Sequence, residues 1–233
     1  MEKINVFWFR RDLRLYDNHA LFQALKSGYP VLPVFIFDKE ILDKLNSKTD
    51  ARVSFIYAEI QKMKTELERN GSSLKIFHTK PSDAFRELTE KYEIQAVFAN
   101  KDYEPYARQR DGEVGELLKA KGIALNLYKD QVIFEEDEVL KDDGTPYTVF
   151  TPYSKKWKQV LNETEIQSFP SEKLTEKFLK TKPFSFPDLK DLGFDESSIE
   201  IPPLEISEEI IRNYAETRDL PAIKGTTRLG VHL

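Results

Sequence analysis

Apolar runs and amphipathic stretches alternate along the first 130 residues of the chain. Five short runs rich in β-forming residues are predicted strands, and they cover residues 4–9, 31–37, 74–78, 96–99 and 124–128. The segments between them carry apolar residues at helical spacing and are predicted helices over residues 17–27, 50–69, 81–92 and 105–121. Strands that are apolar on both faces and joined by helices indicate a parallel sheet covered on both sides. We therefore expect an α/β, Rossmann-like, doubly wound five-stranded parallel sheet over residues 1–130.

The regular pattern ends after this region. Residues 131–206 hold scattered aromatic residues, prolines and charges, which predict a long interdomain linker with one short helix near residues 151–161. Ser207 is predicted to cap a helix of about ten residues that presents Ile210, Ile211 and Tyr214 on one face. Residues 207–233 therefore read as the first piece of a further, helical segment that the chain does not complete.

Composition narrows the class of protein. Hydrophobic residues make up 40% of the chain, which is enough for a packed core, and the absence of cysteine excludes disulfides and thiolate chemistry. The sequence has neither a signal-peptide pattern nor a run approaching the roughly 20 apolar residues of a membrane span. We therefore expect a cytoplasmic protein with no membrane partner. The net charge of −5 makes the chain a poor nucleic-acid binder by bulk charge, so any polyanion site must be local.

Candidate binding residues follow the predicted strands. Ligands of open α/β sheets bind beyond the carboxyl ends of the strands, where the strand order reverses. Three of the loops expected there are dense in charge, and they cover residues 10–14, 38–40 and 101–105. These loops are either merely solvated or form an anion or polar-ring site. At least one arginine of the first loop is expected to pair with Asp12 or Asp102 and hold the loops together.

Several familiar sites are missing from the sequence. No G-x-G-x-x-G follows the first strand and no P-loop lysine motif occurs, which disfavours a standard dinucleotide or triphosphate site. The three histidines are scattered and show no metal-ligand spacing, so we expect no metal site, and His78 is expected to be structural. No catalytic triad or carboxylate pair is indicated by spacing.

Four segments, in order along the whole chain, resemble the DNA photolyase and cryptochrome family. They are WFRRDLRLYDN at residues 8–18, NKDYEPYARQRD at 100–111, YTVFTPYSKKW at 147–157, and Tyr214 with RDLP at 218–221 and GTTRL at 225–229. The resemblance implies an N-terminal antenna domain, a long linker and a C-terminal helical domain that binds FAD. On this basis the chain is expected to stop shortly after the flavin domain begins, without any catalytic residue, and to be inactive alone.

The last segment is similar to the family's entry to the flavin domain. Hydroxyls and backbone N–H groups at a helix start, next to an arginine, suit a phosphate. The resemblance implies that FAD is contacted by Tyr214, Thr226, Thr227, Arg228, Leu229 and Gly230. Gly230 stands where the family often has serine, which removes one hydroxyl donor. Arg218 matches an arginine near the DNA phosphates. A few contacts on one edge fall short of the roughly 12 kcal/mol of nanomolar retention, so we expect this chain alone to lose FAD.

The antenna site is implied by the same resemblance. Members that bind folate carry Asn-Glu where this sequence has Tyr106-Ala107, so an 8-hydroxy-deazaflavin or FMN is favoured over folate. An empty, vestigial pocket is the alternative. Residues expected to surround the ring are Arg10, Phe35, Ile36, Phe37, Asp38, Arg52, Asp102 and Glu104. Apolar residues would flank the ring, Asp38 and Asp102 would accept its N–H or O–H protons, and Arg52 would face an anionic oxygen.

Three functions follow from these observations. The favoured one is a deoxyribodipyrimidine photolyase, a lyase that uses blue light and reduced FAD to reverse cyclobutane pyrimidine dimers in UV-damaged DNA, with this chain as its light-harvesting part. The (6-4) photoproduct is the other lesion considered. The second function is a cryptochrome-like photoreceptor without repair activity, and the third is a nucleotide-binding module unrelated to light. We expect a monomer.

Overall fold

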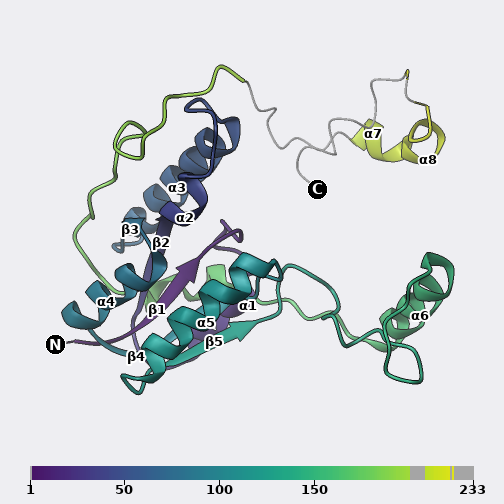
Figure 1. The fold of residues 1–233 in the computed structure, drawn as a ribbon, viewed down its shortest axis with the longest axis horizontal. Coiled ribbons are helices and arrows are strands. Elements are labelled where there is room, and N and C mark those ends of the chain that lie inside the picture. Colours follow the sequence, from purple (N-terminus) through teal and green to yellow (C-terminus); the bar gives the residue numbers. More distant parts are fainter. Residues whose placement is uncertain (1, 200–207, 221, 223–233) are drawn as a thin grey trace.

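The computed structural model describes residues 2–199, 208–220 and 222 (Figure 1). Five strands alternate with helices in the first 128 residues. The strands are β1 (Lys3–Phe9), β2 (Val31–Asp38), β3 (Lys75–Thr79), β4 (Glu93–Asn100) and β5 (Ala124–Tyr128). The intervening helices are α1 (His19–Lys26), α2 (Lys39–Leu42), α3 (Ala51–Arg69), α4 (Pro81–Lys91) and α5 (Pro105–Lys119). All five expected strands and the four expected helices are found in the expected order, and the short helix α2, in the predicted loop after β2, is additional.

The five strands form one parallel sheet in the order β3-β2-β1-β4-β5. Side chains of consecutive strand residues point to opposite faces. In β1, Phe7 and Phe9 therefore belong to the core cluster packed under α1 and α3, whereas Val6 and Trp8 belong to the cluster under α4 and α5. Both faces are buried, which explains why the strands are continuous apolar runs. The predicted doubly wound α/β fold is confirmed.

Capping side chains, prolines and a glycine explain where the helices begin and end. The Asn18 side chain accepts the N–H of Leu21 and caps α1, while Asp50 caps α3 through the N–H of Arg52. Both α4 and α5 begin with proline, whose fixed φ and missing N–H suit the first helical position. Gly71 follows α3 at φ +73°, a left-handed conformation that glycine adopts without steric cost.

Much of the segment after β5 packs back on the sheet domain. A 3₁₀ segment, η1 (Ser171–Lys177), lies against α1, and the stretch that follows it runs past the start of β2 and along α3. Leu179 donates its N–H to the Val31 carbonyl at 2.8 Å, and Phe178, Leu192 and Phe194 are buried in the cluster under α1 and α3. We call residues 171–199 the strap. The expected linker over 131–206 thus includes a part that completes the core.

Two further helical regions lie outside this core. Helix α6 (Phe150–Glu163) is the expected short helix and has no buried residue. The helix expected after Ser207 is interrupted: the structure has α7 (Glu208–Arg212) and α8 (Tyr214–Thr217), separated by Asn213 at φ −93° and ψ 4°. This backbone conformation does not continue an α-helix, so the prediction of one ten-residue helix is wrong. Ser207 itself lies outside the described residues.

The strap provides a stability test. Phe178 is 2% exposed, so Phe178→Ala is expected to lower the free energy of unfolding by about 3–5 kcal/mol, because it removes a buried ring and leaves a cavity. Phe150→Ala on the 78% exposed ring of α6 is the matched control, with a change below about 0.5 kcal/mol. Urea denaturation followed by far-UV circular dichroism measures both. Equal, small changes would mean that the strap is not part of the folded core.

Candidate functional site

A cavity of about 380 Å³ opens beside the carboxyl ends of β1 and β2, next to the place where the strand order reverses. Its volume lies in the range of about 300–1,000 Å³ that is typical of small-molecule pockets. Ligands of doubly wound sheets bind at this edge, because the loops of neighbouring parallel strands meet there. All eight residues expected at the antenna site line the cavity: Arg10, Phe35, Ile36, Phe37, Asp38, Arg52, Asp102 and Glu104.

The inner wall of the cavity is apolar. Phe35, Ile36 and Phe37 come from the end of β2, and Leu42 and Ile56 come from α2 and α3. The Phe35 and Phe37 rings meet edge to face with centroids 5.0 Å apart. The wall suits a flat, largely apolar group, because water gains few hydrogen bonds against it.

The floor of the cavity holds a buried ion-pair network. Arg10 at the end of β1 places Nη1 2.5 and 2.6 Å from the two carboxylate oxygens of Asp111, and its Nη2 donates to the Asn100 carbonyl. The same Asp111 accepts two hydrogen bonds of 3.1 Å from Arg110. The side chains of Arg10, Arg110 and Asp111 are all more than nine-tenths buried. Buried charges are stable only when they are paired in this way.

The network continues toward the mouth of the cavity. Arg11 lies 3.3 Å from the Asp102 carboxylate and 2.7 Å from Glu104, and Arg110 is 4.0 Å from Asp102. The expected arginine pairing with Asp102 is therefore found, and Arg11 makes it. We call these six residues the cavity network: Arg10, Arg11, Asp102, Glu104, Arg110 and Asp111. Three guanidinium groups and three carboxylates alternate in it, so its formal charge is zero.

Asp38 meets the first turn of α5 across the cavity. Its Oδ2 accepts a 2.5 Å hydrogen bond from the Tyr106 hydroxyl, and its Oδ1 accepts the N–H of Glu40 and so caps α2. Burial and the hydrogen bond to Asp38 raise the pKa of Tyr106 far above its usual value, so the hydroxyl remains a donor at neutral pH. The Asp38 carboxylate has lone pairs left for one more donor.

Arg52 differs from its expected environment. Its guanidinium points at Asp50, with hydrogen bonds of 3.0 and 2.6 Å to the two carboxylate oxygens, and 73% of its side chain is exposed. The pKa of Asp50 is lowered chiefly by this contact. Arg52 lines the mouth of the cavity, but an incoming anion would compete with Asp50 for it.

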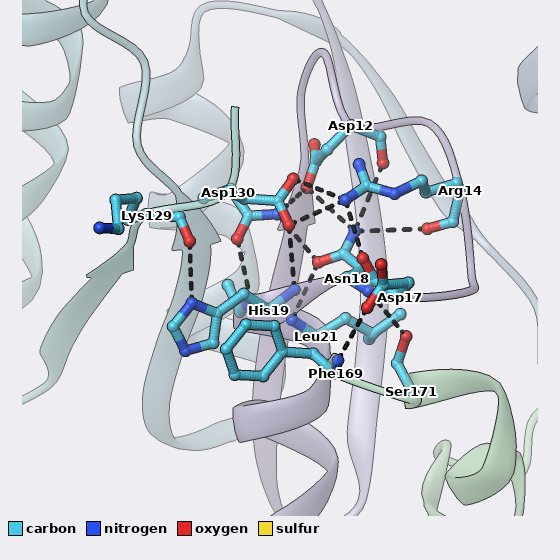
Figure 2. Close-up of polar contacts among 12 residues, drawn as sticks. Asp12, Arg14, Asp17, Asn18, His19, Leu21, Lys129, Asp130, Phe169 and Ser171 are labelled. Atoms are coloured by element: carbon cyan, nitrogen blue, oxygen red, sulfur yellow. Dashed lines mark hydrogen bonds and ion pairs between the residues drawn. The ribbon is translucent and has the colours of Figure 1, made fainter. Parts of the chain in front are cut away.

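The loop after β1, residues 10–14, is held in place by a second polar network, which Figure 2 shows in close-up. The Asn18 amide donates to Asp12, and the Asn100 amide donates to both Asp12 and Asn18, at 2.6 and 2.9 Å. Arg14 donates to both oxygens of Asp130 at 2.8 Å. These contacts join the ends of β1, β4 and β5 to the start of α1. Because Arg10 and Arg11 lie in the same loop, the network fixes where they enter the cavity.

The chain just before the strap is tied to this loop (Figure 2). Asp17 adopts φ +43°, a left-handed conformation that aspartate tolerates, and its carboxylate accepts the Phe169 N–H at 2.7 Å. The Phe169 ring stacks on His19 with centroids 3.7 Å apart. Ser171 donates its hydroxyl to the Leu15 carbonyl and accepts the Asn18 N–H. The loop that supplies the arginines is thus clamped from both sides.

Several residues of the cavity, one on β1 and three on α5, were missed by sequence reasoning. Trp8, Tyr106, Ala107 and Arg110 line the cavity, yet none was assigned to it from the sequence. Tyr106 and Arg110 are four residues apart in α5 and therefore share the face turned to the sheet. That spacing, directly after a charged strand–helix loop, was the available signal. Trp8 carried no separate signal, because it reads as an ordinary buried strand residue.

The residues expected to contact FAD and DNA lie apart from the cavity or beyond the described chain. Tyr214 is 45% exposed on α8, and Arg218 faces Asp219 at 3.5 Å. The residues numbered 226–230, namely Thr226, Thr227, Arg228, Leu229 and Gly230, lie outside the described residues. Among residues 2–199, 208–220 and 222, no group of three metal-ligating side chains is found. None of the helices in that part of the chain is long and apolar enough to cross a membrane.

Comparison with known proteins gives a consistent result. The DNA photolyase family model matches residues 5–173. A deoxyribodipyrimidine photo-lyase from a Synechococcus species is 31% identical over 96% of this chain and 49% of the relative. An archaeal photolyase from Sulfolobus tokodaii, solved with two FAD molecules, is 24% identical with a TM-score of 0.56 over 77% of this chain and 42% of that one. A cryptochrome from Synechocystis is 18% identical with a TM-score of 0.70 over 85% and 41%.

The chain has an α/β domain of the doubly wound type with a cavity at the carboxyl ends of its strands, and the two solved structures share that fold. The chain belongs to the DNA photolyase family. It spans about half the length of the deoxyribodipyrimidine photo-lyases that it matches.

The cavity network yields a stability prediction. Asp111→Asn is expected to lower the free energy of unfolding by about 3–5 kcal/mol, because two buried guanidinium groups lose their shared counter-charge. Asp83→Asn is the matched control, since its partner Arg86 is exposed and such pairs contribute about 0–1 kcal/mol. Urea denaturation at neutral pH measures both changes. A loss for Asp111→Asn no larger than that of the control would show that Asp111 does not carry the network.

Proposed function

We propose that this chain is the light-harvesting part of a DNA photolyase and that its cavity holds a flavin-type ring. The observation that carries the proposal is the cavity itself, in which an apolar wall from β2 faces carboxylates and arginines from three loops. The Synechococcus relative supports the class of enzyme, and the Sulfolobus structure, described as implicating a novel light-harvesting cofactor, supports a second chromophore in the family.

The lining favours a deazaflavin or FMN ring over a folate. The Phe35 and Phe37 side chains would flank the ring, while Asp38 and Asp102 would accept protons from its polar edge. The Tyr106 hydroxyl keeps Asp38 oriented toward the cavity, because it holds one carboxylate oxygen. Glu104 and Arg11 close the mouth with their ion pair.

The whole protein is proposed to act on cyclobutane pyrimidine dimers in DNA. When bound, reduced FAD supplies the photoexcited electron that splits the dimer, and the lesion reaches such a site by base flipping. Tyr214 and the residues 226–230 would contact FAD, and Arg218 would contact the DNA backbone. Arg218 faces an acidic neighbour at the surface, which a phosphate can replace as its partner. We propose that the protein works as a monomer.

A photoreceptor without repair activity is the second candidate. It is favoured by the cryptochrome from Synechocystis, whose fold matches with the TM-score of 0.70. An α/β domain with a ring-sized cavity would serve a photolyase and a photoreceptor equally. The repair assay distinguishes these two functions.

The chromophore proposal is tested by titration. FMN, 8-hydroxy-deazaflavin and folate are each added to the chain, and binding is followed by ligand fluorescence. We expect saturable binding of a flavin-type ring and at least tenfold weaker binding of folate. Ile41→Asp, which puts a charge on the cavity wall, is expected to weaken flavin binding about tenfold, or about 1.4 kcal/mol. Ile166→Asp, exposed and outside the cavity lining, is the control. Tight folate binding, or equal affinity of both variants, would contradict the assignment.

The repair proposal is tested on the full-length protein. Blue-light reversal of cyclobutane dimers in a short oligonucleotide is measured with FAD reduced, and a dark sample serves as the control. Light-dependent repair is expected. Bound FAD without repair of either the cyclobutane or the (6-4) lesion would assign the protein to the photoreceptor class.

A further inference from the structure

Two residues of the cavity lining carry easily oxidised side chains. They are the Trp8 indole and the Tyr106 phenol, whereas the other aromatic residues of the lining are phenylalanines. An excited flavin-type ring is a strong one-electron oxidant. Next to such a ring, an indole or phenol donates an electron, and the excitation is lost before it can be transferred. A light-harvesting site therefore has to make these two donors poor ones.

Cations lie over both rings. The Arg10 and Arg110 guanidinium carbons are 5.1 and 4.9 Å from the centroid of Trp8. Lys44 and Arg110 lie 5.3 and 5.9 Å from the centroid of Tyr106. Arg110 is thus common to the two donors. A cation over a ring face stabilises the neutral ring and opposes the positive charge that oxidation would create.

Burial makes the effect of Arg110 on Trp8 strong. Trp8 is 2% exposed, and the Arg10 and Arg110 side chains are nearly as buried, so solvent screens their charges weakly. Both guanidiniums share the single carboxylate of Asp111, which leaves this group of three charges at +1. The next carboxylate, Asp102, is 4.0 Å from Arg110 and is itself paired with Arg11. The three-charge group that holds the two guanidiniums over the indole is therefore positive.

We propose that Arg110, with Arg10, is a positioning and electrostatic residue that keeps Trp8 from quenching the excited ring in the cavity. The inference rests on the proposed flavin-type ligand. The step that is suppressed moves one electron from the Trp8 indole to the excited ring and leaves an indole radical cation and a ring radical anion. Return of that electron restores both partners, so the only loss is the excitation energy.

Tyr106 is a second donor with a different balance. Its hydroxyl donates to Asp38, which would take the proton when the phenol is oxidised and so favours electron loss. Lys44 and Arg110 oppose that loss from the ring face. The effect of Arg110 on quenching is therefore expected to appear mainly through Trp8.

The test uses FMN as the probe and its fluorescence lifetime as the readout. Arg110→Met removes the charge and is expected to shorten the lifetime of bound FMN at least about threefold, because electron transfer from Trp8 becomes more favourable. Arg110→Lys keeps the charge and is expected to restore most of the lifetime. Adding Trp8→Phe to Arg110→Met is expected to reverse the shortening.

Four results would overturn the proposal. One is an unchanged lifetime in Arg110→Met with FMN bound, and another is equal shortening by Arg110→Lys. A third is shortening that persists without Trp8. The fourth needs no Arg110 variant: Trp8→Phe alone, in the otherwise native chain, is expected to leave the lifetime unchanged, and a severalfold longer lifetime would mean that Trp8 already quenches. Binding is measured first by titration. If neither FMN nor 8-hydroxy-deazaflavin binds to the native chain, the proposed ligand fails and the inference fails with it, whereas bound FMN with an unaltered lifetime overturns the inference alone.

Discussion

The ion pair between Arg10 and Asp111 determines how the rest of the site is arranged. It joins the end of β1 to helix α5, which follows β4, at the point where the strand order reverses. Because Arg110 shares the same carboxylate, the pair also fixes the guanidinium that lies over Trp8. Each of these charges is buried, and a buried charge without a partner is strongly destabilising. The position of one carboxylate on α5 therefore sets the floor of the cavity.

The contacts of the later chain support this arrangement from outside. Asp17 accepts a backbone N–H from Phe169, and Ser171 contacts Leu15 and Asn18, so the arginine loop is held between the sheet and a distant segment. The strap then buries Phe178 and its neighbours under α1 and α3. The position of the arginine loop and part of the core packing thus depend on residues that follow β5. A boundary drawn at residue 130 separates the sheet from part of its own core.

The sequence is most informative where structure follows from periodicity. The five strands are continuous apolar runs because both faces of the sheet are buried, and the residues after them meet because parallel strands end at one edge. Pairing between distant residues leaves no periodic trace, so the contact of Arg110 with Trp8 was not predicted, although helical spacing places Arg110 on the same face of α5 as Tyr106. Arg52 was assigned to a ligand from the family resemblance, whereas its partner in the structure is the nearby Asp50. The packing of the strap was not predicted for a related reason. Its backbone hydrogen bonds to the sheet domain belong to no regular helix or strand, so they leave no periodic pattern in the sequence.

The charges of the cavity argue for a ring as its occupant. Its lining contains four cations, Arg10, Arg11, Arg52 and Arg110, and each has a carboxylate partner within 4 Å. A phosphate entering the cavity would have to displace one of those carboxylates, and a displaced buried carboxylate is costly. A neutral ring needs no such exchange: it buries apolar surface against β2 and offers its polar edge to Asp38 and Asp102. Arg10 and Arg110 then act on Trp8 through cation–π contact, and on the ring in the cavity through their electric fields.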